Sequence, residues 1–225
     1  MRMRIVNVSV LSTVLCVIAS SAFAALTKDE VKRLGESGSV VAELRKAPDK
    51  GIPENLWDKA ECVLVFPSVK KAAFIVGGEY GSGVMSCRQA NGWSAPIFMR
   101  LAKGSFGVQI GAEAADLVLL VMNRRGADKL LQDKVTLGAD ASIAAGPVGR
   151  SGVAATDAQL EAEILSYSRS HGLFAGIDLA GGSLHPDGEA NARAYGHDVV
   201  ARTIVDGSQK VTTPPAARSF VNSLH

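Results

Sequence analysis

The sequence lacks the spacings of the common metal-binding and catalytic motifs. Only three cysteines and four histidines occur in 225 residues. No C-x-x-C or H-x-x-H pair is present, so residue spacing gives no support for a zinc site. No G-x-x-x-x-G-K-[ST] loop and no G-x-S-x-G elbow occurs, which removes two frequent signatures of nucleotide binding and ester hydrolysis. We therefore expect no catalytic residue, no metal and no cofactor in this chain.

An excess of charge of one sign is also missing. The formal net charge is +2. Arg2 and Arg4 lie in a segment that we expect to be removed, so the remaining chain is close to neutral. A protein that binds nucleic acid through overall basicity is therefore disfavoured. Any anionic partner has to be met by a local group of cations.

Residues 1–24 resemble a bacterial secretory signal. Arg2 and Arg4 precede a largely apolar stretch over 5–18, which is shorter than the ~20 residues that a membrane-spanning helix needs. Ala22 and Ala24 give the small-x-small pattern of a cleavage site. Leu15 before Cys16 disfavours a lipoprotein anchor, because a lipid-modified cysteine follows a small residue. We predict an exported protein of the periplasm or cell envelope, with 25–225 forming a single domain.

The first part of that domain has a helical pattern over 27–46. Thr27 and Glu30 have the spacing of a capping box. Gly35 and Gly38 weaken the middle, so one bent helix and two short helices both remain open. Four apolar residues recur at helical spacing beside lysines and arginines: Val31, Leu34, Val41 and Leu44. This stripe suits either insertion into a membrane surface or packing on a sheet. Of the two, we predict that these four residues form a membrane-inserting helix.

A short helix over 54–60 is followed by β-patterned sequence from Cys62 onwards. Short apolar runs alternate with turn signals, among them Asn91-Gly92, and short helices close the chain. We predict an α+β fold in which a mostly antiparallel or barrel-like β core is framed by N-terminal and C-terminal helices. Cys62 and Cys87 fall in strands that we expect to be neighbours, so a disulfide and a pair of buried thiols both remain open.

Two carboxylates precede the apolar run that ends at Met122. Glu113 and Asp116 suit either an acid pair for hydrolysis or structural acceptors for loop N–H groups. We favour the structural role. The glycine-rich stretch that begins at Gly77 opens no convincing helix, so we interpret it as a turn or a close approach of two backbones rather than a nucleotide loop.

Basic residues recur at the strand ends and turns. Lys70 and Lys71 fall in a predicted turn between two strands. If the fold gathers several of these cations on one face, an anion-binding patch results in a neutral protein; if it does not, they form an ordinary solvated surface. The candidate lipid-binding residues are Lys70, Lys71, Arg88, Arg100, Lys103 and Arg150.

The order of several motifs resembles the SYLF domain family. The resemblance covers about residues 30–205 and its most specific part is "LGADASIAAGPVGR". The motifs, in chain order, are "GSGV", "GWSAP", "GVQIGAEAAD", "VTLGADASIAAGPVGR", "SYSRSHGLFAGIDLAGG" and "EANARAYG". In "KKAAF", Lys71 and Phe74 match the family pattern and Ala73 replaces a glycine.

This resemblance implies a non-enzymatic binding module. Eukaryotic relatives bind phosphoinositide membranes through an amphipathic N-terminal helix and a basic surface, and some bind and bundle actin. Our leading hypothesis is binding of anionic lipids, with phosphoinositide-like headgroups, at a membrane surface. The alternative is a structural or interaction protein of the envelope that binds a protein partner such as host actin.

Overall fold

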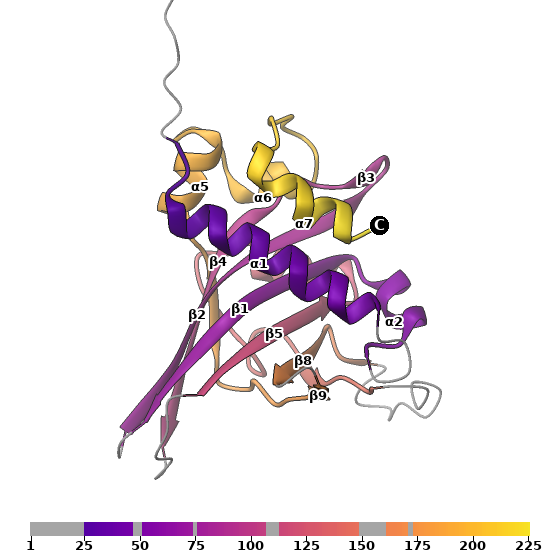
Figure 1. Cartoon of the computed structure of the whole chain (residues 1–225), viewed down its shortest axis with the longest axis vertical. Coiled ribbons are helices and arrows are strands. Elements are labelled where there is room, and N and C mark those ends of the chain that lie inside the picture. The colour runs from indigo at the N-terminus through magenta and orange to yellow at the C-terminus, as the bar shows by residue number, and fades with distance from the viewer. Residues whose placement is uncertain (1–24, 47–50, 74–75, 107–112, 149–160, 171–172) are drawn as a thin grey trace, which may run out of the picture.

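A computed structural model describes residues 25–46, 51–73, 76–106, 113–148, 161–170 and 173–225. It consists of a curled sheet with helices from both ends of the chain on one of its faces (Figure 1). The helices are α1 Lys28–Arg45, α2 Glu54–Lys59, α3 Arg124–Leu130, α5 Gly188–Tyr195, α6 Ala201–Val205, the 3₁₀ turn η2 Pro215–Ala217 and α7 Arg218–Ser223. The predicted α+β class and antiparallel core are confirmed.

The strands of the described residues form one sheet, and almost all of their pairings are antiparallel. The order is β6-β10-β4-β2-β1-β5-β8-β7, with β3 on β2 and β9 on β8, and β7 runs parallel to β8. The strands are β1 Cys62–Ala73, β2 Val76–Gln89, β3 Gly92–Trp93, β4 Ile97–Phe106, β5 Glu113–Val121, β6 Val135–Thr136, β7 Ile143–Ala145, β8 Ile164–Ser170, β9 Leu173–Gly176 and β10 Ser183–Pro186.

The predicted N-terminal helix is present as a single element, α1. The capping box is formed: Glu30 N donates to Thr27 Oγ1 at 3.2 Å, and Thr27 N donates to Glu30 Oε2 at 2.7 Å. Gly35 does not divide the helix. The amphipathic pattern therefore outweighs the helix-weakening glycines, because the apolar face packs against the sheet and α7.

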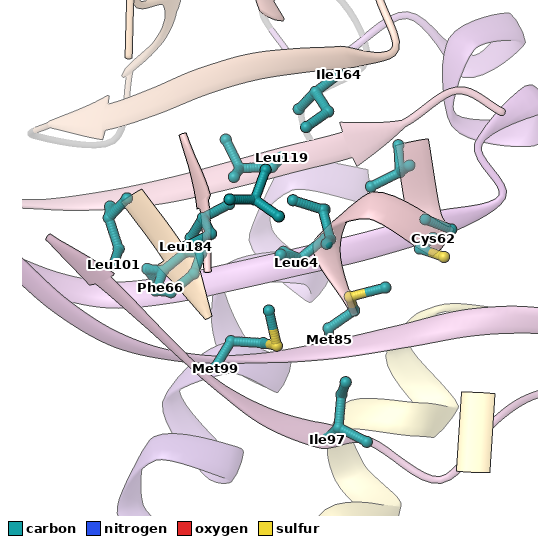
Figure 2. Close-up of a cluster of buried hydrophobic side chains, with 14 of the residues drawn as sticks. Cys62, Leu64, Phe66, Met85, Ile97, Met99, Leu101, Leu119, Ile164 and Leu184 are labelled. Atoms are coloured by element: carbon teal, nitrogen blue, oxygen red, sulfur yellow. The ribbon is translucent and has the colours of Figure 1, made fainter. Parts of the chain in front are cut away.

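Both faces of the central strands are buried, which explains their nearly continuous apolar sequences. On the outer face, Val63, Val65 and Val84 pack beneath α1 and α7. On the inner face of the curl, a second cluster is formed by alternate residues of the same strands (Figure 2). Figure 2 labels Cys62, Leu64, Phe66, Met85, Ile97, Met99, Leu101, Leu119, Ile164 and Leu184. A sheet buried on both sides needs apolar residues at odd and even positions alike.

The hairpin formed by β1 and β2 differs from the sequence prediction. Lys70 and Lys71 do not form a turn; they lie within β1, which continues to Ala73. A register shift between Phe66 and Val69 marks a bulge in this strand. β1 and β2 extend past α1 as a long arm, along which β4 also runs because Val76 of β2 pairs with Phe106 (Figure 1).

Two cross-strand predictions are resolved by the register. Cys62 lies directly opposite Cys87 in the β1–β2 pair, and the two form a disulfide. The hairpin predicted at Asn91-Gly92 is also present, but its turn lies one residue earlier: β2 pairs with β3 through Gln89 and Gly92, so the turn residues are Ala90 and Asn91. Gly92 has a positive φ of 118°, which suits glycine.

Candidate functional site

A charged groove lies between the N-terminal half of α1 and the outer face of the sheet. Its cavity volume is about 540 Å³. Lys32 and Arg33 line it from α1, Lys70 and Tyr80 from the β1–β2 arm, and Arg100 and His185 from β4 and β10. We call this cavity the α1–sheet groove. Four cations from segments far apart in the sequence line this one hollow: Lys32, Arg33, Lys70 and Arg100.

A bulge in β1 determines which lysine enters the groove. Phe66 and Val69 both face the inner cluster, although strict alternation would put them on opposite faces. Ser68 is part of this bulge and has a positive φ of 54°. Ser68 N donates to Asp116 Oδ1 at 2.9 Å, so β5 holds the bulge in place. Lys70 is consequently directed to the outer face, where its exposed side chain lines the groove.

The base of the groove contains a carboxylate shared by two arginines. Asp187 caps α5, with Ala190 N donating to its Oδ1 at 3.3 Å. Arg100 Nε lies 2.9 Å from Asp187 Oδ2, and Arg33 Nη1 lies 3.9 Å from the same oxygen. Burial alone would raise the pKa of Asp187, but the hydrogen bonds from Arg100 and Ala190 and the two positive charges hold it below its ordinary value. Asp187 is therefore ionised at neutral pH.

Arg33 is the most buried cation of the groove. Its side chain is 15% exposed, and its guanidinium carbon lies 5.6 Å from the centre of the Phe98 ring. Burial lowers its pKa, which the neighbouring Asp187 and Glu30 oppose. Its Nη1 has no hydrogen-bond acceptor within the described part of the chain, since 3.9 Å to Asp187 is too long for one.

Of the six basic residues predicted as one patch, the groove brings together Lys70 and Arg100. Lys103 points elsewhere: its amine donates to Asp178 O at 3.0 Å. Arg88 lies at the far end of β2, where it donates to Ala60 O and Trp57 O and stacks on Trp93. Arg150 and the side chain of Lys71 lie outside the described residues. The structure thus does not assemble a single patch from these six positions.

The apolar stripe of α1 faces the protein interior, which corrects the prediction that all four of its residues insert into a membrane. Leu34 and Val41 are 0% exposed and Leu44 is 3% exposed, within the outer core cluster. Only Val31 of the four is exposed, at 43%. Burial of each such side chain is worth about 1.5–3 kcal/mol, so these three residues stabilise the fold instead.

Asp116 has the structural role expected of it. Besides the Ser68 N–H, it accepts a hydrogen bond from Arg169 Nη1 at 3.2 Å, and Arg169 also contacts Glu43 of α1. This chain of contacts ties β1, β5, β8 and α1 together. Glu113 begins β5, and its side chain lies outside the described residues. Within the described ranges, no group of His, Cys, Asp or Glu side chains is placed to hold a metal ion.

None of the helices described here has the length and apolarity required to cross a membrane. The predicted signal at 1–24, including Cys16, lies outside the described residues.

Together these features define the class of protein: an α+β domain built on a curled antiparallel sheet, with a charged groove beside its N-terminal helix. The chain belongs to the SYLF, or Ysc84, family. The family model described as "Ysc84: Las17-binding protein actin regulator" matches residues 102–225, which include the end of β4 and the Asp187 cap of α5.

Three curated relatives illustrate the similarity. LAS seventeen-binding protein 3 of Saccharomyces cerevisiae is 35% identical over 173 residues, covering 75% of this chain and 37% of the relative. Protein YSC84 of the same yeast is 35% identical over 180 residues, covering 78% and 38%. SH3 domain-containing YSC84-like protein 1 of Mus musculus is 35% identical over 202 residues, covering 88% and 58%. The chain thus spans between 37% and 58% of the length of these relatives.

Three groove residues were not identified from the sequence. Tyr80 lies in the glycine-rich stretch from Gly77, which we interpreted as a turn or a close approach of two backbones, but which forms part of strand β2. The aromatic residue itself was a usable signal, because aromatic residues are favoured in strands. Asp187 precedes "GEANARAY" at the position of a helix N-cap, which is a usable signal. Arg33 has no comparable signal, because its role depends on the placement of α1 beside α5.

Proposed function

We propose that this chain is a non-enzymatic binding module that recognises a protein partner of the actin system, or an envelope protein that presents a similar surface, through the α1–sheet groove. The observation that carries this proposal is a pair of side chains on the β1–β2 arm. Tyr80 is 67% exposed, and the Lys70 amine has no ion pair within the described residues. The description of the family as a Las17-binding actin regulator supports a protein partner.

An exposed tyrosine beside an unpaired lysine suits protein recognition on physical grounds. Tyrosine supplies a large contact area with few rotatable bonds, and it is among the residues that dominate binding energy at interfaces. A lysine at the edge of the contact steers an acidic partner and sets its orientation. Both side chains lie exposed on the solvent side of the arm, where a partner can reach them.

The test is co-sedimentation of the purified protein with actin filaments in the absence of lipid. We expect saturable binding that is at least about tenfold weaker for Tyr80→Ala and for Lys70→Glu, in line with hot-spot residues at interfaces. Val200→Ala and Lys134→Glu are matched controls, since both wild-type side chains are exposed and lie outside the groove. Absence of binding to filaments, or equal losses in the control variants, would refute actin recognition through this groove.

Binding to an anionic membrane is the second candidate, and the same arm supports it. A lysine near an anionic bilayer contributes about 1 kcal/mol, and tyrosine is favoured at membrane–water interfaces. Few of the predicted cations are available for this contact, however, since Lys103 and Arg88 are engaged elsewhere. Vesicles of phosphatidylcholine with and without anionic lipid, compared across a salt series, test this candidate. Binding that does not weaken with salt, or that survives Lys70→Glu, would refute it.

Export is part of the proposal. The pattern over 1–24 supports processing before Ala25, which would place the groove in the periplasm or at the cell surface. Expression of the complete chain in a bacterial host, followed by fractionation and N-terminal sequencing, tests this step. An intact first segment on cytoplasmic protein would count against export.

A further inference from the structure

The base of the α1–sheet groove contains more donors than acceptors. Two guanidinium groups converge on the single carboxylate of Asp187, and only Arg100 makes hydrogen bonds to it. Asp187 is 4% exposed, and its other oxygen already caps α5. Asp187 can therefore accept few further hydrogen bonds, and Arg33 Nη1 is left buried without an acceptor in the described structure. A buried donor without a partner is costly unless something else binds to it.

The other charges of the groove do not remove this imbalance. Glu36 lies 3.7 Å from Lys32, and both side chains are largely exposed, so they form a weak pair at the rim. Asp29 lies on the same rim of α1 and also faces solvent. Lys70 closes the opposite wall with its amine unpaired among the described residues. A cation from each wall is thus available to one small anionic group between α1 and the arm.

The position of Arg33 indicates the kind of partner that can reach it. Its guanidinium lies over Phe98 beneath α1, with 15% of the side chain exposed. The flat surface of a bilayer contacts the rims of a groove before its base. A side chain from an extended polypeptide segment enters a cavity of about 540 Å³ without difficulty.

We propose that the α1–sheet groove binds a carboxylate side chain of an acidic protein segment. The carboxylate accepts hydrogen bonds from the solvent-accessible edge of the Arg33 guanidinium and from the Lys70 amine, and Tyr80 packs against the aliphatic part of the same segment. Arg100 stays with Asp187 and keeps the base of the groove rigid. This inference rests on the proposed function and specifies the chemistry of the partner: an Asp- or Glu-rich stretch.

The direct test is calorimetric titration of the purified protein with a short polyglutamate peptide, acetylated and amidated so that only its side chains carry charge. Polyglutamine of the same length is the control ligand. We expect binding of polyglutamate alone, weakening as salt rises. Because a hydrogen bond to a charged group is lost, Arg33→Gln and Lys70→Gln should each weaken binding by about tenfold or more. Lys134→Gln, an exposed site outside the groove, should leave it unchanged.

Arg33→Lys separates the loss of binding from a loss of folding. It keeps the charge and removes the planar fork, so thermal unfolding should change little while peptide binding still weakens. If polyglutamine binds as well as polyglutamate, or if Lys70→Gln and Arg33→Lys both leave the affinity unchanged, the carboxylate site is refuted.

Parallel experiments distinguish this inference from the proposed function and from other anions. Filament binding that depends on Tyr80, together with no peptide binding, overturns the carboxylate site and leaves the protein-binding proposal standing. Binding of inorganic phosphate or of anionic vesicles that is stronger than that of the peptide, and is lost in Arg33→Gln, assigns the groove to phosphate chemistry and overturns the inference. Failure of filaments and peptide alike overturns both.

Discussion

Replacement of Gly83 by alanine tests the packing of the β1–β2 arm on which the groove depends. Gly83 belongs to the "GSGV" motif that carries part of the family resemblance. A Cβ atom placed there would lie 2.4 Å from Val65 O and 2.5 Å from Cδ1 of the Phe66 ring. Both distances are far below van der Waals contact. The carbonyl belongs to the backbone of the paired strand, and Phe66 is fully buried, so neither neighbour has room to move.

The expected cost follows from overpacking. Extra methyl groups in a well-packed core cost about 1–3 kcal/mol, and more when the backbone must shift. Since a carbonyl and an aromatic ring both have to move here, we expect about 3 kcal/mol. For a domain of this size each kcal/mol lowers Tm by about 2–4 °C, so Gly83→Ala should lower Tm by about 6–12 °C.

Thermal and urea unfolding followed by circular dichroism measure this loss. Gly35→Ala is the matched control, because nothing lies within 4 Å of its added Cβ and the residue is in a helix. That variant should gain about 0.5–1 kcal/mol from the lower entropy of its unfolded chain. If Gly83→Ala changed the free energy of unfolding by less than about 0.5 kcal/mol, the close approach of β1 and β2 described above would be wrong.

Three further predictions concern stability. Reduction of the Cys62–Cys87 disulfide, whose residues are 25 apart in sequence, should lower the free energy of unfolding by about 3.5 kcal/mol; equal stability with and without reductant would contradict this. Asp116→Ala should cost about 1–3 kcal/mol in urea unfolding because it leaves the Ser68 N–H unpaired, and a neutral effect would refute its role in the bulge. Burial alone would raise the pKa of Glu163, but hydrogen bonds from Lys129 and its other donors hold this pKa below the ordinary 4.5. The ionised Glu163 therefore stabilises the fold above about pH 4.5, and this stabilisation is lost as the pH falls. Glu163→Gln should therefore unfold more easily at pH 7, and its free energy of unfolding should fall less steeply below about pH 4.5. If the variant lost stability at low pH as steeply as the wild type, this role of Glu163 would be excluded.

Local signals in the sequence were sufficient to predict most elements. Thr27 and Glu30 mark the start of α1, and the structure contains the capping box that their spacing predicts. The apolar runs of β1 and β5 are long because these strands lie in the middle of the sheet and are covered on both faces. Such features depend on neighbours within a few residues, so a single sequence reveals them.

The candidate site was harder to predict because its geometry depends on long-range register. Lys70 was assigned to a turn, since neither the bulge at Ser68 nor its tie to Asp116 has a local signature. The pairing of Asp187 with Arg100 and Arg33 joins residues from α1, β4 and the start of α5. Arg88 and Arg100 are both arginines at strand positions, but Arg88 donates to backbone carbonyl groups and so stabilises the fold instead of lining the groove. Only the three-dimensional arrangement separates these cases.

The bulge in β1 also makes the charge of the groove sensitive to chain length. In a strand, adding or removing one residue exchanges the two faces for every position that follows. Deleting Ser68 would restore strict alternation with Val69 inside and Lys70 still outside, because the bulge absorbs this one residue. An insertion or deletion in β1 without a compensating bulge would instead send Lys70 towards the apolar inside of the curl. Relatives that differ in that way would present a different set of side chains beside α1, and their ligand preferences would diverge without any substitution in the groove.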